Sequence, residues 1–209
     1  MNRALRSGLW APLRARGFTT RTDRIGWRYV GDSIDLIEVN SIGPLADAVG
    51  CTSYSFGATV ASLPPYQASR FVPAGPDGRP RPHYWHCELR KTLAKSLRQP
   101  WFRPFSAPVN PRLVPGMLGH REGLKGVIRG DAHDRADTWF VRDDGSNLDE
   151  DIVDLLAAVD TEGLPLLETF HDPCAVARIL RAEELWIVPS SPAGQELIAA
   201  ALDACAEGA

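Results

Sequence analysis

Two histidines and a cysteine lie close together in the chain, at His83, His86 and Cys87. Imidazole nitrogens and a thiolate are zinc ligands, and a histidine beside a cysteine can also activate the thiol as a nucleophile. The residues around them alternate in polarity, which predicts a strand over 83–93. Successive side chains of a strand point to opposite faces, so His86 and Cys87 would not share one ion. We therefore expect a strand histidine beside a buried cysteine, with no metal site and no catalytic residue.

Three other segments carry only part of a functional motif. His171 and Asp172 could act as a base and its orienting carboxylate, but Asp172 precedes a proline and is typical of a helix cap. The cluster of three aspartates and one histidine at 131–137 lacks the glycine and the spacing of a calcium loop. The glycines at 116–130 lack the Gly-Lys-Ser/Thr ending of a phosphate-binding loop. The chain also lacks the Gly-x-Ser-x-Gly motif of serine hydrolases, and we expect no cofactor.

Polar side chains within the expected strands give the best candidate for a binding site. Glu38, Glu88 and Arg90 each alternate with apolar neighbours, and on one half-covered sheet face they would form a polar groove. The alternative is an exposed sheet face with cross-strand ion pairs worth about 0.2–1 kcal/mol each. The expected groove is lined by Arg28, Glu38, Ser55, His86, Glu88 and Arg90.

An antiparallel sheet would position these side chains. Residues 33–39 and 52–61 both alternate at the two-residue period of a half-buried strand, and we expect them to be neighbours in the sheet. Residues 24–30 form an earlier strand, joined to the next by a Gly31-Asp32 hairpin turn. In the 52–61 run one face is small and polar, which leaves room for a helix or a ligand to lie close. A short strand is also expected at 138–142.

Helices are expected at both ends of the chain. Leucines at four-residue spacing predict a helix over 2–16, ended by Gly17. A capping box predicts another from Asn147, with aspartates and a glutamate in its first turn and Gly163 at its end. Asp172-Pro173 and Ser191-Pro192 open two more, the last running to Cys205.

The expected fold class is therefore α+β, with an antiparallel sheet of about four or five strands and helices mainly on one face. At 209 residues and 44% hydrophobic content the chain can form a single domain over 1–209. A proline-rich excursion at 64–82 and a long loop at 100–130 would lie on its surface. The longest apolar runs are shorter than the roughly 20 residues of a membrane helix. The four cysteines lie far apart and without a Cys-x-x-Cys pair, which indicates reduced thiols and a cytoplasmic location.

Charge is divided unevenly along the chain. Residues 1–130 contain 19 lysines and arginines and 8 aspartates and glutamates, whereas residues 131–209 contain 4 and 18. One interpretation is a basic surface that meets an anion such as a nucleic acid. The other is that the two halves face and neutralise each other, within the fold or in a homodimer.

Six short segments of the chain occur in a distinctive order: 13–18, 37–41, 54–57, 86–90, 139–141 and 163–168. In this order they resemble a bacterial family known only as a domain of unknown function, family 4304. The resemblance spans most of residues 5–180 and implies an α+β fold with an antiparallel sheet. It implies no activity and no site residues, because none is assigned to that family. The proline-rich 64–82 segment departs from the family pattern.

The sequence thus favours a cofactor-free binding module that holds a protein or small-molecule partner through a polar sheet face. A toxin-neutralising or other defence-linked role is one version of this, by analogy alone. A nucleic-acid binder using the basic half is the first alternative. A hydrolase built around His86, Glu88 and the 131–137 cluster is the second.

Overall fold

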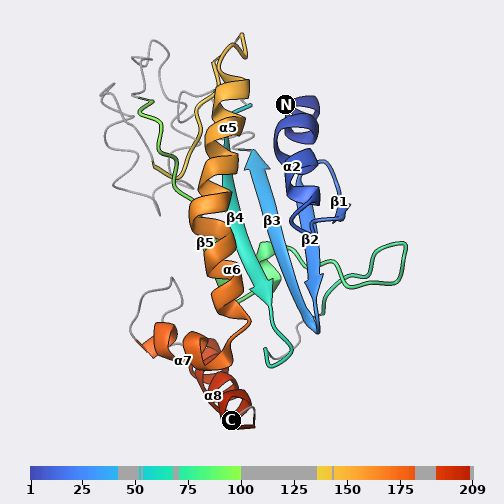
Figure 1. Ribbon diagram of the computed structural model, residues 1–209, viewed down its shortest axis with the longest axis vertical. Helices are drawn as coiled ribbons and strands as arrows, with labels where there is room; N and C mark the ends of the chain where they lie inside the picture. The colour runs from blue at the N-terminus through green and yellow to red at the C-terminus, as the bar shows by residue number, and fades with distance from the viewer. Residues whose placement is uncertain are drawn as a thin grey trace, which may run out of the picture.

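A computed structural model describes residues 1–41, 52, 54–67, 71–99, 136–142, 144–181 and 192–207. At its centre lies a five-stranded antiparallel sheet in which each strand pairs with the next along the chain (Figure 1). With helices packed on it, the sheet confirms the predicted α+β fold. The strands are β1 (Thr20–Arg21), β2 (Ile25–Val30), β3 (Ser33–Ser41), β4 (Phe56–Leu63) and β5 (Leu89–Thr92).

The expected pairing of the two longest strands is confirmed. β3 and β4 are antiparallel neighbours, with Ile37 opposite Val60 and Glu38 opposite Thr59. The β2–β3 hairpin turns at Gly31, whose φ of 55° is a left-handed value that favours glycine. Between β3 and β4, residues 42–51 and 53 lie outside the described residues.

The amino-terminal helix is continuous through α1 (Asn2–Ala4), the π-helical segment η1 (Leu5–Trp10) and α2 (Ala11–Arg14). Gly17 follows with φ of 92°, which confirms its predicted role as the helix-ending residue. This helix lies close to α5 (Leu148–Ala158), since a Cβ at Gly8 would lie 2.6 Å from Cγ2 of Ile152. This close crossing brings two helices side by side over one face of the sheet (Figure 1).

The long helix runs through α5 (Leu148–Ala158), the π-helical segment η5 (Val159–Gly163) and α6 (Leu164–Phe170). The prediction that Gly163 ends the helix is therefore wrong. Gly163 has helical dihedral angles, and a Cβ there would lie 3.0 Å from Cγ1 of Val60. The absence of a side chain at Gly163 allows the helix to approach β4 closely. The sequence pattern does not distinguish this role from that of a helix-ending glycine.

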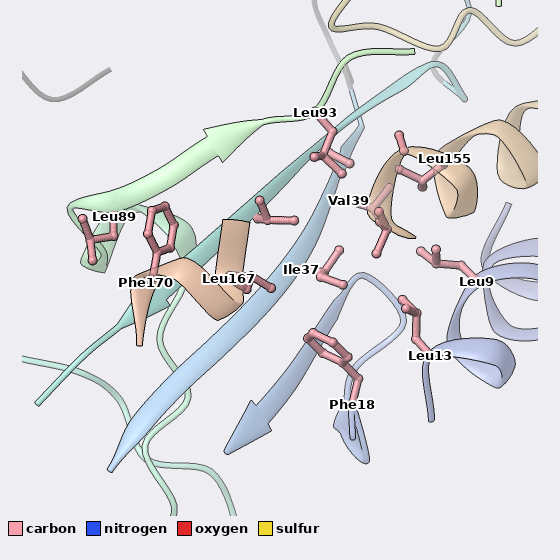
Figure 2. Close-up of a cluster of buried hydrophobic side chains, with 14 of the residues drawn as sticks. Leu9, Leu13, Phe18, Ile37, Val39, Leu89, Leu93, Leu155, Leu167 and Phe170 are labelled. Carbon is pink, nitrogen blue, oxygen red and sulfur yellow. The ribbon is translucent and has the colours of Figure 1, made fainter. Parts of the chain in front are cut away.

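The side chains between these helices and the sheet form the larger core (Figure 2). We call this side of the sheet the helix face; Ile37, Val39 and Val60 lie on it and are fully buried or nearly so. Because antiparallel partners share a face, Arg28 and Asp35 also lie on it. The helix face is completed by buried residues of the helices, among them Leu9, Leu13, Phe18, Leu155, Leu167 and Phe170.

The opposite side, which we call the far face, carries a smaller apolar cluster. Trp27, Leu36 and Ala61 lie there, and Tyr84 and Cys87 pack against them. Trp27 Nε1 donates to the carbonyl of Pro82 at 2.7 Å, and the Tyr29 hydroxyl donates to that of Pro80 at 3.0 Å. The last residues of the predicted proline-rich excursion, 79–82, thus lie against β2.

The strand predicted over 83–93 is confirmed only at Leu89–Thr92. Residues Tyr84–His86 form a 3₁₀ turn, η3, instead. The backbone N–H of His83 donates to Nδ1 of His86 at 2.9 Å, which closes the turn through a side chain. The turn directs Cys87 into the far-face cluster, where it is fully buried. Similarly, the strand predicted at 138–142 is reduced to one bridge between Trp139 and Phe56.

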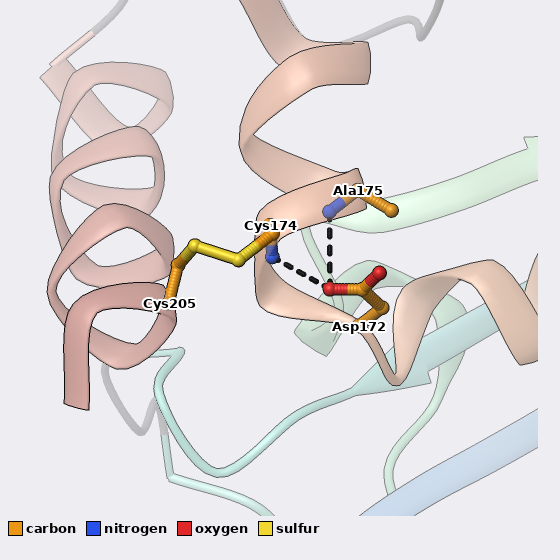
Figure 3. Close-up of a disulfide and its surroundings, with 4 residues drawn as sticks. All are labelled: Asp172, Cys174, Ala175 and Cys205. Atoms are coloured by element: carbon orange, nitrogen blue, oxygen red, sulfur yellow. Dashed lines mark hydrogen bonds between the residues drawn. A yellow bond between two sulfur atoms is a disulfide. The ribbon is translucent and has the colours of Figure 1, made fainter. Parts of the chain in front are cut away.

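Helices α7 (Pro173–Arg181) and α8 (Pro192–Glu207) pack against each other at the end of α6 (Figure 1). The Asp172 carboxylate accepts the N–H groups of Cys174 and Ala175 at 2.9 and 3.2 Å, which confirms the predicted cap. A disulfide joins Cys174 to Cys205, with 5.0 Å between their Cα atoms (Figure 3). The expectation of reduced thiols is therefore wrong for this pair, because helix packing brings together cysteines 31 residues apart.

Within the described segments, every helix is too short or too polar to cross a bilayer.

Candidate functional site

The six residues expected to line one groove lie in three different environments. Arg28 is opposite Asp35 in the β2–β3 register and faces the helices, whereas Glu38 is on the far face. Arg90 is opposite Ala61 and shares the far face with Glu38. The expected single groove is therefore wrong for Arg28, since a sheet separates it from Glu38.

Arg28 belongs to a charge cluster under α6. Its Nε and Nη2 donate to the fully buried carboxylate of Asp35 at 3.0 and 2.8 Å. Nε2 of His171 lies 3.1 Å from both oxygens of Asp35, and Arg28 also pairs with Glu168 at 2.8 Å. His171 thus faces Asp35 rather than Asp172. A charged residue within the apolar run of β3 was the signal in the sequence that a buried partner was needed.

Ser55 is fully buried and serves the chain itself. Its Oγ accepts the N–H of Val141 at 2.9 Å. A Cβ at Gly57 would lie 3.1 Å from the carbonyl oxygen of Asp137. The small polar face expected to leave room for a helix or a ligand is therefore filled at this end by the backbone of 137–141.

Glu38 lies beneath the η3 turn on the far face. Its side chain is 6% exposed, and it accepts the N–H of Tyr84 at 3.2 Å. Nδ1 of His83 lies 3.3 Å from the same carboxylate oxygen. A buried carboxylate that meets an imidazole and a backbone donor fixes the position of the turn above it.

The hydrogen bonds of the turn determine what its second histidine can do. Because Nδ1 of His86 accepts the N–H of His83, the proton of the neutral ring is on Nε2. Nε2 is then a donor and has no lone pair for a metal. Among the described residues no group of three or more histidines, cysteines or acids is arranged to hold a metal ion. Cys87 is also a poor nucleophile, because burial raises the pKa of its thiol.

The outer surface of the turn is aromatic. The ring of Trp85 stacks on His83 with 4.1 Å between centroids and 8° between planes, and Tyr84 meets Trp85 edge-on. Trp85 is nevertheless 47% exposed. In a strand over 83–93, Trp85 and Cys87 would share one face, whereas the 3₁₀ turn buries Cys87 and leaves Trp85 exposed. The sequence carried no signal for this exposure.

Two polar side chains fasten the turn from below. Arg90 donates to the carbonyls of Tyr84 and Cys87 at 3.3 and 3.2 Å. Gln67 donates to the carbonyl of His86 at 2.8 Å and accepts the N–H of Glu88 at 3.1 Å. Four of the six expected residues therefore belong to, support or flank the turn: Glu38, His86, Glu88 and Arg90. We define the η3 surface as the exposed Trp85 together with the half-buried His83, Tyr84, His86 and Arg90 around it.

A second polar network lies on α5. The fully buried carboxylate of Asp151 accepts Nε2 of Gln99 at 2.5 Å and Nδ2 of Asn147 at 3.0 Å. Trp139 Nε1 donates to Asp154 at 2.9 Å, so α5 holds the segments 95–99 and 138–142. Burial is the main cause that raises the pKa of Asp151 to about 7. Asp151 is thus a structural anchor in the acidic first turn.

The raised pKa of Asp151 predicts a fold that loses stability as pH rises. The pKa of Asp151 is about 7 in the folded protein and 3.8 ordinarily, so the folded state holds this proton more tightly than the unfolded chain. The resulting stabilisation is complete below about pH 3.8 and is lost as pH rises through about 7. The loss is at most about 1.4 kcal/mol per pH unit. Urea unfolding at about pH 5 and about pH 8 measures it. Asp151→Asn should flatten this dependence, and the exposed Asp149→Asn should not. An unchanged pH dependence in Asp151→Asn would contradict the assignment.

The uneven charge of the chain is partly neutralised within the fold. Arg16 pairs with Asp160 at 2.6 Å, Arg28 pairs with Glu168 at 2.8 Å, and Lys91 pairs with Glu162. Each pair joins the basic half to the acidic half. For these residues the interpretation that the two halves face each other is confirmed.

Comparison with known proteins returned no match among family models, curated proteins or solved structures. The resemblance to the family of unknown function therefore stays a prediction.

Proposed function

We propose that this protein is a binding module that holds a partner protein through the η3 surface. The observation that carries the proposal is Trp85, a large apolar side chain that is half exposed although its position is fixed. Tryptophan is among the residues that most often dominate the energy of protein interfaces. Surface aromatic patches that the fold does not use are typical of interaction sites.

The rigidity of the turn supports this function. His83 stacks on one side of Trp85, Glu38 holds the backbone of Tyr84, and Arg90 and Gln67 hold the carbonyls around it. A side chain that is already fixed loses little entropy when a partner covers it. The polar residues found in the sequence therefore act by positioning an aromatic contact, and Glu38 need not touch the partner.

The alternatives have less support. A hydrolase would use His86, whose Nδ1 is engaged within the turn, and the 131–137 cluster, most of which lies outside the described residues. A nucleic-acid binder would use basic residues that are in part paired with acids of the carboxy-terminal half.

We further propose membership of the family of unknown function from the sequence resemblance, a cytoplasmic location from the spacing of the cysteines, and a defence-linked role by analogy. The binding module itself does not depend on this assignment.

Replacing Trp85 is expected to abolish partner binding without unfolding the protein. Trp85→Ala removes a half-exposed ring that stacks on His83, so stability should fall by about 1–2 kcal/mol, while the free energy of partner binding should weaken by about 2 kcal/mol or more. Immobilised wild-type protein and Trp85→Ala are exposed in parallel to extract of the native host, and captured proteins are identified by mass spectrometry.

The matched control is Val153→Ala on α5, another apolar side chain that is 67% exposed. A protein captured by wild type and Val153→Ala but absent from Trp85→Ala is the expected result. Capture of the same proteins by all three baits, or of none by wild type, would refute the η3 surface as the binding site.

A further inference from the structure

Three arginines on the far face are each held over an aromatic ring. The guanidinium carbon lies within 6 Å of the ring centroid in all three pairs, the distance at which a cation is attracted by the ring. The pairs are Arg79 over Tyr29 at 5.1 Å, Arg81 over Trp27 at 5.5 Å and Arg90 over Tyr84 at 5.9 Å.

The three pairs share one face because of the strand register. Trp27 is opposite Leu36 and Tyr29 is opposite Ile34, so both rings lie on the far face. Tyr84 packs against the same apolar cluster from the η3 turn. The arginine–aromatic pairs thus continue from the η3 surface across β2.

Stacking orders these arginines without neutralising them. A guanidinium held over a ring keeps its N–H donors at its rim, where they suit a carboxylate. Arg79 is exposed, and Arg81 pairs only with Asp77, at 3.1 Å, among the ion pairs of the described residues. Gly75 makes room for this arrangement, because a Cβ there would lie within 2.6 Å of the Arg81 side chain.

Exposed acidic groups are common on the helices. Asp149 and Glu150 on α5 and Glu196, Asp203 and Glu207 on α8 are all exposed. Exposed arginines such as Arg3 and Arg178 also lie on helices, so the far face is distinguished by arginines that are stacked on aromatic rings.

We propose that the partner of the η3 surface is a protein with an acidic segment. Its carboxylates would meet the exposed Arg79 and share Arg81 with Asp77, while an apolar side chain packs on Trp85. This inference rests on the proposed function and names the chemistry of the partner. A nucleic acid is disfavoured because duplex binders commonly make about six to ten phosphate contacts. The far face offers three stacked arginines, one of which already pairs with Asp77 and another of which caps two carbonyls.

The test is a titration with a fluorescein-labelled oligoglutamate peptide at low ionic strength, followed by fluorescence anisotropy. Wild type should bind, and Arg79→Gln should weaken binding about tenfold, the expected loss of one charge-assisted contact. Arg79→Gln/Arg81→Gln should weaken it further. Arg79→Gln changes an exposed side chain, so it reports on binding even if the double variant unfolds.

Arg3→Gln/Arg178→Gln is the matched control, because it removes two exposed positive charges from α1 and α7. It should bind oligoglutamate as wild type does. No binding by wild type, or equal weakening in the control, would overturn the inference, as would tighter binding to duplex DNA of matched charge. A Trp85-dependent partner captured from extract without sensitivity to Arg79→Gln would leave the proposed function standing and remove this inference alone.

Discussion

Asp35→Ala is expected to lower the free energy of unfolding by about 3–5 kcal/mol, much of the stability of a typical domain. Asp35 is fully buried and accepts two hydrogen bonds from Arg28, whose side chain is 13% exposed. Removing the carboxylate leaves a guanidinium with little water and only Glu168 as a charged partner. Urea unfolding followed by far-ultraviolet circular dichroism measures the loss.

Two further variants separate an unpaired charge from a lost side chain. Asp35→Leu/Arg28→Met removes both charges and should be milder than Asp35→Ala, because Glu168, which also loses Arg28, is 59% exposed and stays hydrated. Asp23→Ala breaks a surface pair with Arg6, in which the side chains are 45% and 62% exposed, and should cost at most about 1 kcal/mol. Equal losses for Asp35→Ala and Asp23→Ala would contradict the importance of burial.

The sheet could be predicted because its signals are local. Alternation at 33–39 and 52–61 predicts strands, and a glycine at the turn predicts the hairpin before them. Strand pairing then follows from chain order, because adjacent strands in a meander need only short connections.

The candidate site could not be predicted because it depends on which strand lies opposite which. Arg28 and Glu38 both alternate with apolar neighbours, yet a β2–β3 register with Ile25 opposite Glu38 places them on different faces. The exposure of Trp85 depends on a hydrogen bond between His83 and His86 that a strand would not make. A side chain that closes a turn produces no periodic signal in the sequence.

Gly163 and the cysteine pair show that contacts between helices and their neighbours could not be predicted from the sequence either. Gly163 serves a contact with Val60, and a glycine used for close approach cannot be distinguished by type from one that ends a helix. Cys174 and Cys205 are brought together by the packing of α7 on α8, which spacing alone does not reveal.

The disulfide leads to the second large effect, because α8 packs mainly on α7 and is tied to it by this bond. Cys174→Ser should destabilise the α7–α8 pair by about 3–4 kcal/mol, the loop entropy that a cross-link spanning 31 residues removes from the unfolded chain. Adding a dithiol reductant to wild type should lower its melting temperature by as much as Cys174→Ser does. Amide hydrogen exchange should place the loosening in α8 rather than in the sheet.

Cys174→Ser is also its own control, since reductant should not change the melting temperature of a variant that has no disulfide to break. Insensitivity of the wild-type melting temperature to reductant would contradict the stabilising role. The bond further tests the predicted cytoplasmic location, where thiols are normally kept reduced. Cells quenched with acid and alkylated should show Cys174 and Cys205 as thiols if the protein resides there, with α8 then held by packing alone. Recovery of the intact disulfide would favour an oxidising compartment.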